Sequence, residues 1–540
     1  MPGLISSLYS SYSGMSVSQM NIQTTSHNIN NMNTPGYTRQ KVVQTQRGAY
    51  SYPGTNSYLG AGQLGQGVQA NDIIRVRNSF HDFQYRNESH EYGEIAKKYE
   101  NLRHMETIFN EPSDSSISSA YNDFYMSWHE LSKRPGDAGS IDVVIQNSKY
   151  LSQNISSVTQ KLESMKDQIN KDIEDNINAI NSSIERLRAL EKDIKLVEGS
   201  GKTPNDLYDE VDRIIDDLSF RMNVTTDEAK SFIDAAIEPG KEVIIGKDAN
   251  GNPTLEIATK EVYDEYGKYV GKVDTNKPIM VDTDGDGQGD KLTGYEVVNR
   301  NGQKVGEVAV DEQGDRTGEV TAKNSQGKDM TVPANTQSID IRDASGEIEG
   351  SFTMLNKIDE YVNDMKNMAK HLADNVNKII KENTNPQIDE QIFVFDETKN
   401  PIISVSENAR DILGKIPHDQ MVNIAKEMYD LKDEKVIPVL DSNGAPVLDE
   451  DGNPKHVTIN NFYNDLIQKL GNETQEVIRA ESNQSKVLNS IESSRLSVTG
   501  VSLDEEMVNL IQFQHSYSAS AKVISTLDSL LEVVINGLKK

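Results

Sequence analysis

Apolar side chains recur at heptad spacing in the first thirty residues of the chain. The positions that follow this spacing are Ile5, Leu8, Tyr12, Met15, Ile22 and Ile29. Such a 3-4 alternation places the side chains on one face of a helix, which predicts an N-terminal amphipathic helix. Polar Gln19 and Ser26 interrupt this face, and Ser and Asn fill much of the remaining surface. Because such a helix has weak propensity and little to bury by itself, it needs a partner.

The last forty residues repeat the 3-4 alternation and supply that partner. Apolar positions on the predicted C-terminal face include Met507, Leu510, Tyr517, Ile524, Leu531 and Ile535. A chain that leaves along one helix and returns along another forms an antiparallel pair if its ends meet. We therefore predict a terminal coiled-coil module of residues 1–35 and 500–540. Uncharged helices with an interrupted apolar face cannot hold themselves together, so both ends should become ordered only on assembly.

Long helical patterns occupy much of the interior of the chain. Apolar residues keep helical spacing across residues 151–187, and the Gly-Ser-Gly run at 199–201 predicts where this helix ends. Trp128 is the only tryptophan, and we expect it in a core. Residues 36–227 and 346–499 should form a mainly helical rod domain with small β patches.

The composition changes near Asp227. Residues 228–345 contain short β-branched runs separated by Gly, Asn and Asp, which predicts an inserted all-β outer domain. The expected fold class is therefore mainly α with β. It combines a discontinuous terminal coiled-coil module and a long-helix rod domain, which carries the inserted domain.

One acidic run in the insertion has the spacing of a calcium loop. Its candidate ligands are the carboxylates of Asp282, Asp284, Asp286 and Asp290. These residues take positions 1, 3, 5 and 9 of the loop, and a glycine takes position 6. Position 12 is Thr293 and not the usual bidentate Glu, and no amphipathic helices flank the run. A Ca²⁺ site and a metal-free acidic turn therefore both stay open.

Composition narrows the function classes. The chain has 55 Lys and Arg against 84 Asp and Glu, a formal net charge of −29, which argues against a nucleic-acid partner. It has no run of 18 apolar residues and no signal-peptide pattern at its start, so we expect neither membrane insertion nor a Sec-type signal. Cysteine is absent, which excludes thiol catalysis. No spacing of acidic residues or histidines selects a catalytic pair or a zinc site, so we predict no enzyme activity.

An octapeptide follows the N-terminal helix. Its residues are Asn33, Thr34, Pro35, Gly36, Tyr37, Thr38, Arg39 and Gln40. Pro disfavours helix at the preceding residue and Pro-Gly favours a turn, so the helix should end near Met32. The octapeptide resembles the signature of axial flagellar proteins, and its Tyr-x-Arg-Gln ending is most similar to hook-associated proteins of the FlgK type. Residues 500–507 and 513–524 resemble the C-terminal half of that family signature.

This resemblance implies a structural subunit with no active site and no cofactor. A FlgK-type protein is an axial subunit at the junction between flagellar hook and filament, and it assembles through its terminal helices. The twelve apolar positions named above for the two helices then form an assembly seam. The implied partners are further copies in a helical lattice, the hook protein and a second junction protein. The resemblance also implies secretion through the flagellar export apparatus, with an export chaperone on the C-terminal segment.

Two alternative functions stay open for the chain. Another axial flagellar subunit, of hook or rod type, would share the Asn-Thr-x-Gly pattern but would usually carry Phe where this chain has Tyr37. A calcium-binding surface module would place the working surface in residues 228–345. The intact motifs at both ends favour the junction subunit over either alternative.

Overall fold

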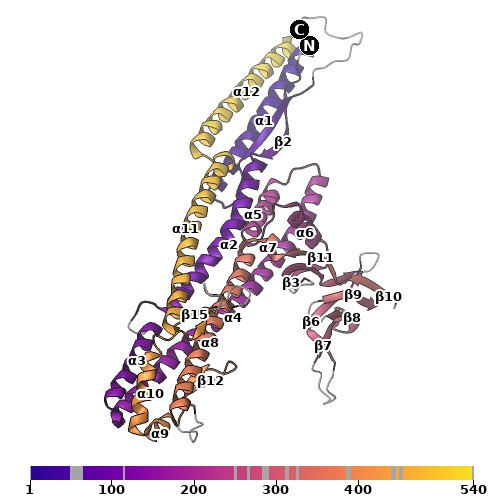
Figure 1. The fold of residues 1–540 in the computed structure, drawn as a ribbon. Coiled ribbons are helices and arrows are strands. Elements are labelled where there is room, and N and C mark those ends of the chain that lie inside the picture. Colours follow the sequence, from indigo (N-terminus) through magenta and orange to yellow (C-terminus); the bar gives the residue numbers. More distant parts are fainter. Residues whose placement is uncertain are drawn as a thin grey trace. The chain divides into compact units, whose positions relative to one another are not determined.

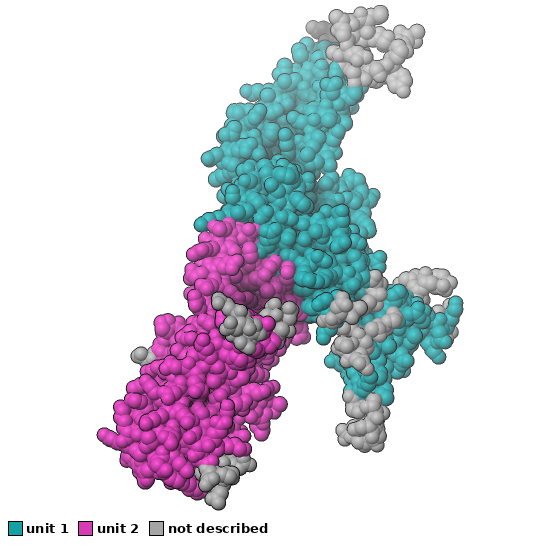
Figure 2. Space-filling view, viewed as in Figure 1, with its two compact units in different colours: residues 1–91, 177–346, 485–540 teal, residues 92–176, 347–484 magenta. Residues whose placement is uncertain are grey.

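The structure is a computed structural model (Figure 1), and it describes most of the chain. The described residues are 2–48, 65–113, 116–248, 252–263, 268–281, 291–310, 316–323, 328–384, 391–439, 446–448 and 454–537. They form two compact units (Figure 2), in which unit 1 comprises residues 1–91, 177–346 and 485–540, and unit 2 comprises residues 92–176 and 347–484. Four long helices contribute residues to both units: α2 (Ser79–Phe109), α4 (Ala138–Gly199), α8 (Gly346–Asn383) and α11 (Ile459–Thr499).

The two ends of the chain pair in unit 1, as predicted. Helix α1 (Pro2–Asn31) and helix α12 (Leu503–Gly537) lie side by side and antiparallel, with the N- and C-terminus at the same end of the pair (Figure 1). Strands β1 (Gln40–Gln46) and β2 (Val68–Arg75) form an antiparallel ribbon that contacts α1. The chain therefore leaves the terminal pair through a hairpin of strands before the long helices begin.

Helix α4 confirms the helical spacing seen in the sequence. Its apolar positions are buried, and they are Leu151, Ile155, Val158, Leu162, Met165, Ile169, Ile173, Ile177, Ile180, Ile184 and Leu187. The helix ends at Gly199, where the sequence predicts a stop, and Gly201 follows with a positive φ of 75°. Helix α5 (Asn205–Arg221) then turns its buried side toward the rest of unit 1, with Ile214 and Leu218 buried.

The inserted region of unit 1 begins with a helix before its strands. Helix α6 (Asp227–Ile237) is capped by the Thr226 side chain, which accepts from the Ala229 amide, and it buries Phe232 and Ala236. The first strand starts only at Lys241. This region was expected to be all-β because its apolar residues are short runs, but a good N-cap and a buried face at helical spacing favour helix over its first eleven residues.

Two antiparallel sheets follow, and the short helix α7 (Ile341–Ala344) ends the insertion. The three-stranded sheet has the order β11-β4-β3, from β3 (Lys241–Lys247), β4 (Pro253–Thr259) and β11 (Asn335–Asp340). The six-stranded sheet has the order β10-β9-β8-β7-β6-β5, from β5 (Glu261–Tyr263), β6 (Tyr269–Val281), β7 (Lys291–Val298), β8 (Lys304–Val310), β9 (Arg316–Lys323) and β10 (Asp329–Pro333). The core of the larger sheet consists mostly of valines, among them Val273, Val297, Val308 and Val320.

Two side chains of α4 hold the insertion. Asn181 donates to the carbonyl of Val243 at 2.8 Å and accepts from its amide at 2.7 Å, so it pairs with the edge of β3 as a strand would. Arg188 donates to the carbonyls of Ala236, Ile237 and Glu238 at the end of α6. Both contacts satisfy backbone groups that an edge strand and a helix end leave open.

Unit 2 is mainly helical around an aromatic core. Besides its parts of the long helices, it contains α3 (Ile117–Lys133), α9 (Ala409–Gly414), α10 (His418–Asp430) and the strand pairs β12 (Phe393–Phe395) with β13 (Ile403–Val405) and β14 (Ile437–Pro438) with β15 (His456–Val457). Trp128 on α3 is fully buried beside Phe124, as expected, and α10 packs on α3.

Candidate assembly site

The contact between α1 and α12 includes small and polar side chains. Ser18 donates to Ser516 at 3.1 Å, and a Cβ added to Gly14 would lie 3.4 Å from the Ser520 hydroxyl oxygen. The buried residues of α1 are Ser13, Val17, Ser18, Asn21, Thr24, Thr25 and Asn28. Small side chains allow the two backbones to approach closely, but they bury little apolar area. The pair therefore gains little from the hydrophobic effect on its own.

The structure covers the predicted assembly seam only in part. Five of its residues are exposed, namely Ile5, Tyr12, Met507, Tyr517 and Ile535. The other seven are half-buried, namely Leu8, Met15, Ile22, Ile29, Leu510, Ile524 and Leu531. Further large apolar side chains are exposed on the same two helices, including Tyr9, Val508, Ile511 and Val533. A concentration of exposed apolar side chains on one helix pair is typical of a surface that other chains cover.

The octapeptide forms the turn that follows α1. The helix ends at Asn31, next to the predicted stop, and the Thr34 amide donates to the Asn31 carbonyl at 2.9 Å. Gly36 has a φ of 80°, a left-handed conformation that favours glycine. The side chains of Asn33, Thr34 and Pro35 are exposed. The first half of the motif thus shapes the backbone, while its second half makes the side-chain contacts.

Asn28 is the centre of those contacts, and it is 1% exposed. Its side-chain oxygen accepts from the Tyr37 hydroxyl at 2.8 Å and from the Gln40 amide at 2.9 Å. Its side-chain amide donates to the Gln40 carbonyl at 2.9 Å and to Glu506 at 3.1 Å. All four hydrogen-bonding positions of this amide are used. Asn28 therefore joins α1, the octapeptide and α12.

Arg39 ties the octapeptide to the start of α12. Its Nε lies 2.7 Å from Glu506 Oε1 and its Nη2 lies 3.0 Å from Glu505 Oε1. Its backbone amide donates to the Thr499 carbonyl at 2.9 Å, at the end of α11. Burial lowers the pKa of Arg39, but the hydrogen bonds and charges of the two glutamates outweigh burial and raise the pKa above its usual value. The guanidinium is therefore charged throughout the physiological pH range.

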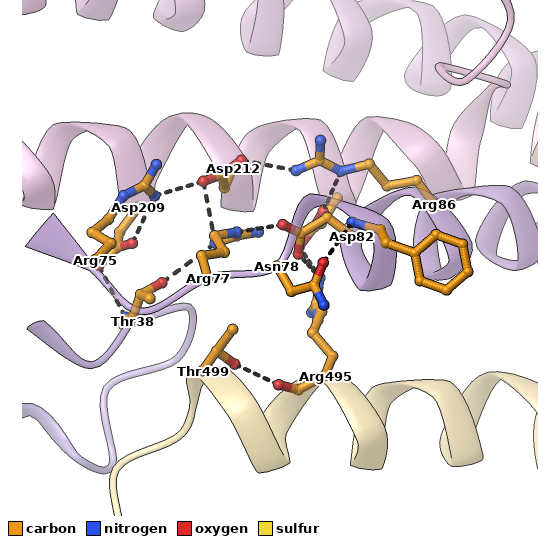
Figure 3. A network of polar contacts seen from close by, with 12 residues as sticks. Thr38, Arg75, Arg77, Asn78, Asp82, Arg86, Asp209, Asp212, Arg495 and Thr499 are labelled. Atoms are coloured by element: carbon orange, nitrogen blue, oxygen red, sulfur yellow. Dashed lines mark hydrogen bonds and ion pairs between the residues drawn. The ribbon is translucent and has the colours of Figure 1, made fainter.

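Within unit 1, a network of ion pairs lies next to the octapeptide (Figure 3). Asp212 on α5 lies at its centre, within 2.6 Å of Arg75, 3.1 Å of Arg77 and 2.9 Å of Arg86. Four further contacts complete the network: Arg75 with Asp209, Arg77 with Asp82, Arg86 with Asp216, and Arg495 of α11 with Asp216. Asp209 also accepts from the backbone amide of Thr38. The network thus links β2, α2, α5 and α11 beside the octapeptide.

Neither the network nor the octapeptide is arranged for chemistry. Each carboxylate in the network is paired with an arginine, and arginine is a poor proton donor or acceptor. In the part of the chain that the structure describes, no three His, Cys, Asp or Glu side chains are grouped to hold a metal ion. The acidic run with Asp282, Asp284, Asp286 and Asp290 lies outside the described residues. No helix within the described ranges combines the length and apolar character needed to cross a membrane.

The polar residues that hold this site together could not be predicted from the sequence. Asn28 is one of many Asn residues in an uncharged helix, and nothing in its neighbourhood distinguishes it. Glu506 did carry a signal, since it precedes Leu510 and Phe513 at helical spacing on a half-buried side of α12. A carboxylate on such a side needs a buried partner. Its partners Asn28 and Arg39 lie more than 460 residues earlier in the chain, and sequence spacing cannot find them.

The contacts predict that order is graded along the terminal pair of the free chain. Amides near Asn28 and Glu506 should exchange slowly, because buried hydrogen bonds hold this end of both helices. Amides of residues 4–12 and 524–537 should exchange faster, since this end of the pair leaves Ile5, Tyr9, Val533 and Ile535 exposed. Hydrogen exchange by mass spectrometry on the dilute chain measures both. Strong protection along both helices would contradict the prediction that neighbours complete their folding.

Three regions of the chain match families of flagellar proteins. Residues 102–296 match the helical domain of flagellar hook-associated protein FlgK. Residues 8–38 match the flagella basal body rod protein family, and residues 492–537 match the C-terminal region of the basal body rod FlgEFG proteins. The two terminal matches cover most of α1 and α12 together with the end of α11.

Relatives of similar length are found in several bacteria. Flagellar hook-associated protein 1 of Bacillus subtilis is 28% identical over 530 residues, which cover 97% of this chain and 96% of the relative. The proteins of the same name from Escherichia coli and Salmonella typhimurium are 22% and 24% identical, and each alignment covers 97% of this chain and 98% of the relative. The solved structure of the flagellar hook junction protein FlgK from Burkholderia pseudomallei shares 12% identity, covers 58% of this chain and 47% of that chain, and has a TM-score of 0.33, too low to support an inference.

Proposed function

We propose that the chain belongs to the FlgK family of flagellar hook-associated proteins, that it is an axial subunit of the hook-filament junction, and that it builds this junction by joining its terminal helices to those of neighbouring copies. The observation that carries the proposal is the uncovered apolar surface of the α1 and α12 pair. In the subunit these helices meet in part through small side chains, such as Ser18 with Ser516 and Gly14 with Ser520. Neighbouring helices in a helical lattice would bury the large apolar residues that the pair leaves open.

The octapeptide and the ion-pair network are suited to support this helix pair. The octapeptide and the ion-pair network bind the base of the terminal pair to α5 and α11 through many charged contacts. A subunit that transmits load along an axis needs such a connection, but it needs neither an active site nor a cofactor. We accordingly propose that the chain is not an enzyme and that it works without a metal. The hook protein would cover one side of its lattice, and a second junction protein the other.

A hook or rod subunit is the alternative function that one observation favours. The terminal helices match rod protein families, and these matches alone would suit either class. The match of residues 102–296 to the FlgK helical domain favours the junction subunit. Tyr37 favours it too, because its hydroxyl donates to Asn28, a contact that phenylalanine at this position could not make.

The junction role predicts the phenotype of cells that lack this chain. Their hooks should carry no filaments, and the filament protein should appear in the culture medium, because nothing adapts the hook lattice to the filament lattice. Electron microscopy of the hooks and analysis of the medium measure both effects. Restoring the full chain should restore the filaments. Cells that lack the chain but carry normal filaments would contradict the junction role.

Export is the second part of the proposal. We propose that the subunit leaves the cell through the flagellar export apparatus and lies in the extracellular part of the flagellum. Residues 507–521 contain no Asp, Glu, Lys or Arg, and they expose Met507, Val508, Ile511 and Tyr517. Such a segment would aggregate in the cytoplasm if nothing covered it. An export chaperone that binds the C-terminal segment would cover it before assembly.

The chaperone proposal predicts that the C-terminal segment supplies most of the binding free energy between the chain and the chaperone. The full chain should bind the export chaperone, whereas a chain that ends at Gly500 should lose most of the affinity, because the apolar side of α12 is gone. Titration calorimetry with the purified chaperone compares the two chains. A chain that lacks residues 240–340 is the matched control and should bind as the full chain does. Equal affinity of the full chain and the chain ending at Gly500 would rule out a C-terminal site.

A further inference from the structure

Glu506 is a buried carboxylate within an otherwise uncharged contact. Helix α1 contains no Asp, Glu, Lys or Arg. Helix α12 contains several charged residues, but only Glu506 among its described residues is buried, with 2% of its surface exposed. Burying a carboxylate is costly unless charged or polar partners surround it. Its place in the pair therefore depends on those partners.

Both oxygens of Glu506 are held, and by different elements. Oε1 accepts from Arg39 Nε at 2.7 Å, and Arg39 belongs to the octapeptide. Oε2 accepts from Asn28 Nδ2 at 3.1 Å, and Asn28 belongs to α1. The octapeptide is itself hydrogen-bonded to Asn28 through Gln40. The Glu506 carboxylate can therefore contact both Arg39 and Asn28 at only one position of α12 along α1.

Contacts of small residues between α1 and α12 select the position of α12 less sharply than these charged and amide groups do. Two of them are Ser18 with Ser516 and Gly14 with Ser520, and small residues recur along both helices. A shift of α12 by one helical turn, about 5.4 Å, would place Ser18 opposite Gln512 or Ser520, and neither introduces an unpaired charge. The connection at residues 500–502 would permit it, because three residues can span up to about 10 Å. The same shift would separate Glu506 from Arg39 and Asn28, its two partners.

We propose that Glu506 sets the register of α12 on α1. A single buried polar group can specify register in paired helices at some cost in stability. The register decides which exposed apolar residues of the two helices stand side by side, and therefore which surface a neighbouring copy meets. In this last step the proposal rests on the proposed function. Glu506 acts here as a positioning residue and makes no contact with the neighbour itself.

Engineered disulfides can measure this register directly, because the chain has no cysteine of its own. Ser18→Cys with Ser516→Cys reports the observed register, since the two hydroxyl oxygens lie 3.1 Å apart. Ser18→Cys with Gln512→Cys, or with Ser520→Cys, reports a shift of one turn in either direction. Disulfides form only where the two Cα atoms come within about 7 Å. All three cysteine pairs are oxidised in the purified full chain.

Each cysteine pair is tested in three backgrounds: the native chain, Glu506→Gln and Glu505→Gln. The Glu506→Gln substitution keeps the shape of the side chain but replaces one carboxylate oxygen with an amide nitrogen. This nitrogen cannot accept a hydrogen bond, so Arg39 or Asn28 loses an acceptor. Glu505 is the matched control, because it is the neighbouring carboxylate, pairs with the same Arg39 at 3.0 Å and is exposed. Removing an exposed partner costs little.

We expect the native chain and Glu505→Gln to cross-link mainly in the observed register. In Glu506→Gln the yield of the shifted pairs relative to the observed pair should rise on the order of tenfold. An unchanged preference in Glu506→Gln would overturn the proposal. So would loss of all three cross-links in that variant, which would mean that Glu506 holds the pair together without selecting a register. Absence of the observed cross-link in the native background would overturn the pairing itself.

The cross-links also separate this proposal from the proposed function. They form in the free chain, so they report register whether or not the chain assembles at a hook. A native chain with the expected cross-links that never reaches the hook tip would count against the junction role only. A chain that restores filaments but cross-links equally in all three registers would count against Glu506 only.

Discussion

Replacing Asp212 with alanine is expected to destabilise unit 1 by about 2–3 kcal/mol, somewhat less than removing one partner from a fully buried ion pair. The Asp212 side chain is 18% exposed and lies within 3.1 Å of three guanidinium groups, those of Arg75, Arg77 and Arg86. Without it, three positive charges share the remaining carboxylates at the base of the terminal pair (Figure 3). Denaturant unfolding of the purified chain, with hydrogen exchange to locate the effect, measures the change.

A neighbouring aspartate on the same helix provides the control. Asp217 pairs only loosely with Arg221, at 3.4 Å, and its side chain is 57% exposed. Asp217→Ala should change the free energy of unfolding by less than about 0.5 kcal/mol. Exchange within unit 2 should stay unchanged in both variants. Similar effects of Asp212→Ala and Asp217→Ala would show that the network contributes no more than surface ion pairs do.

The Asp212 carboxylate should also make the stability of unit 1 depend on pH. Burial raises the pKa of Asp212, but the charges of Arg77, Arg75 and Arg86 outweigh burial and hold the pKa below its ordinary value. A carboxyl whose pKa is lower in the folded state stabilises the fold above its unfolded pKa of about 3.9. This stabilisation is lost as the pH falls through the folded pKa. The difference in stability between the native chain and Asp212→Ala should therefore shrink below about pH 4.

Replacing Tyr12 with aspartate should abolish incorporation at the hook tip and leave the free subunit folded. Tyr12 is 60% exposed in the subunit, so its replacement should change the free energy of unfolding by no more than about 0.5 kcal/mol. In the lattice the same position is expected to be covered by a neighbouring helix. An unpaired carboxylate buried there costs several kcal/mol, which is a loss of assembly by a factor of about a hundred or more.

Met280 provides a control of the same chemistry on another surface. It lies on β6 in the inserted sheet and is 44% exposed. Met280→Asp makes the same change, from an exposed large side chain to a charge, but away from the terminal pair. It should assemble normally. Equal incorporation of the two variants would indicate that Tyr12 faces solvent in the assembled flagellum as well.

Periodic features of this fold could be predicted from the sequence because they are local. The spacing of apolar residues from Leu151 to Leu187 is enough to place α4, and the Gly-Ser-Gly run places its end. The antiparallel pairing of the ends followed from two matching patterns and the need of each for a partner. Helix α6 was missed because a helix of eleven residues with only three buried positions, Ala229, Phe232 and Ala236, gives a weak periodic signal beside the β-branched runs that follow.

The candidate site was predictable only in part, for a different reason. Its octapeptide and apolar positions are visible as motifs, but the groups that hold them are isolated polar residues. Asp212 meets Arg75 across 137 residues and Asn28 meets Glu506 across 478. No local pattern joins such partners, since the pairing depends on the tertiary fold. The sequence also could not show that most buried residues of α1 are small or polar, while Ile5, Tyr12, Met507, Tyr517 and Ile535 are exposed.

The most direct test of the central claim, that the terminal helices are the working surface, compares two variants in cells that lack the native chain. One carries Tyr12→Asp, and the other lacks residues 240–340, which hold all described strands from β3 to β11. The measurement is the fraction of hooks that carry filaments, counted by electron microscopy. We predict filaments on most hooks of cells with the shortened chain and on almost none with Tyr12→Asp. Filaments with Tyr12→Asp and bare hooks with the shortened chain would contradict the account, because the insertion would then be the surface that assembles.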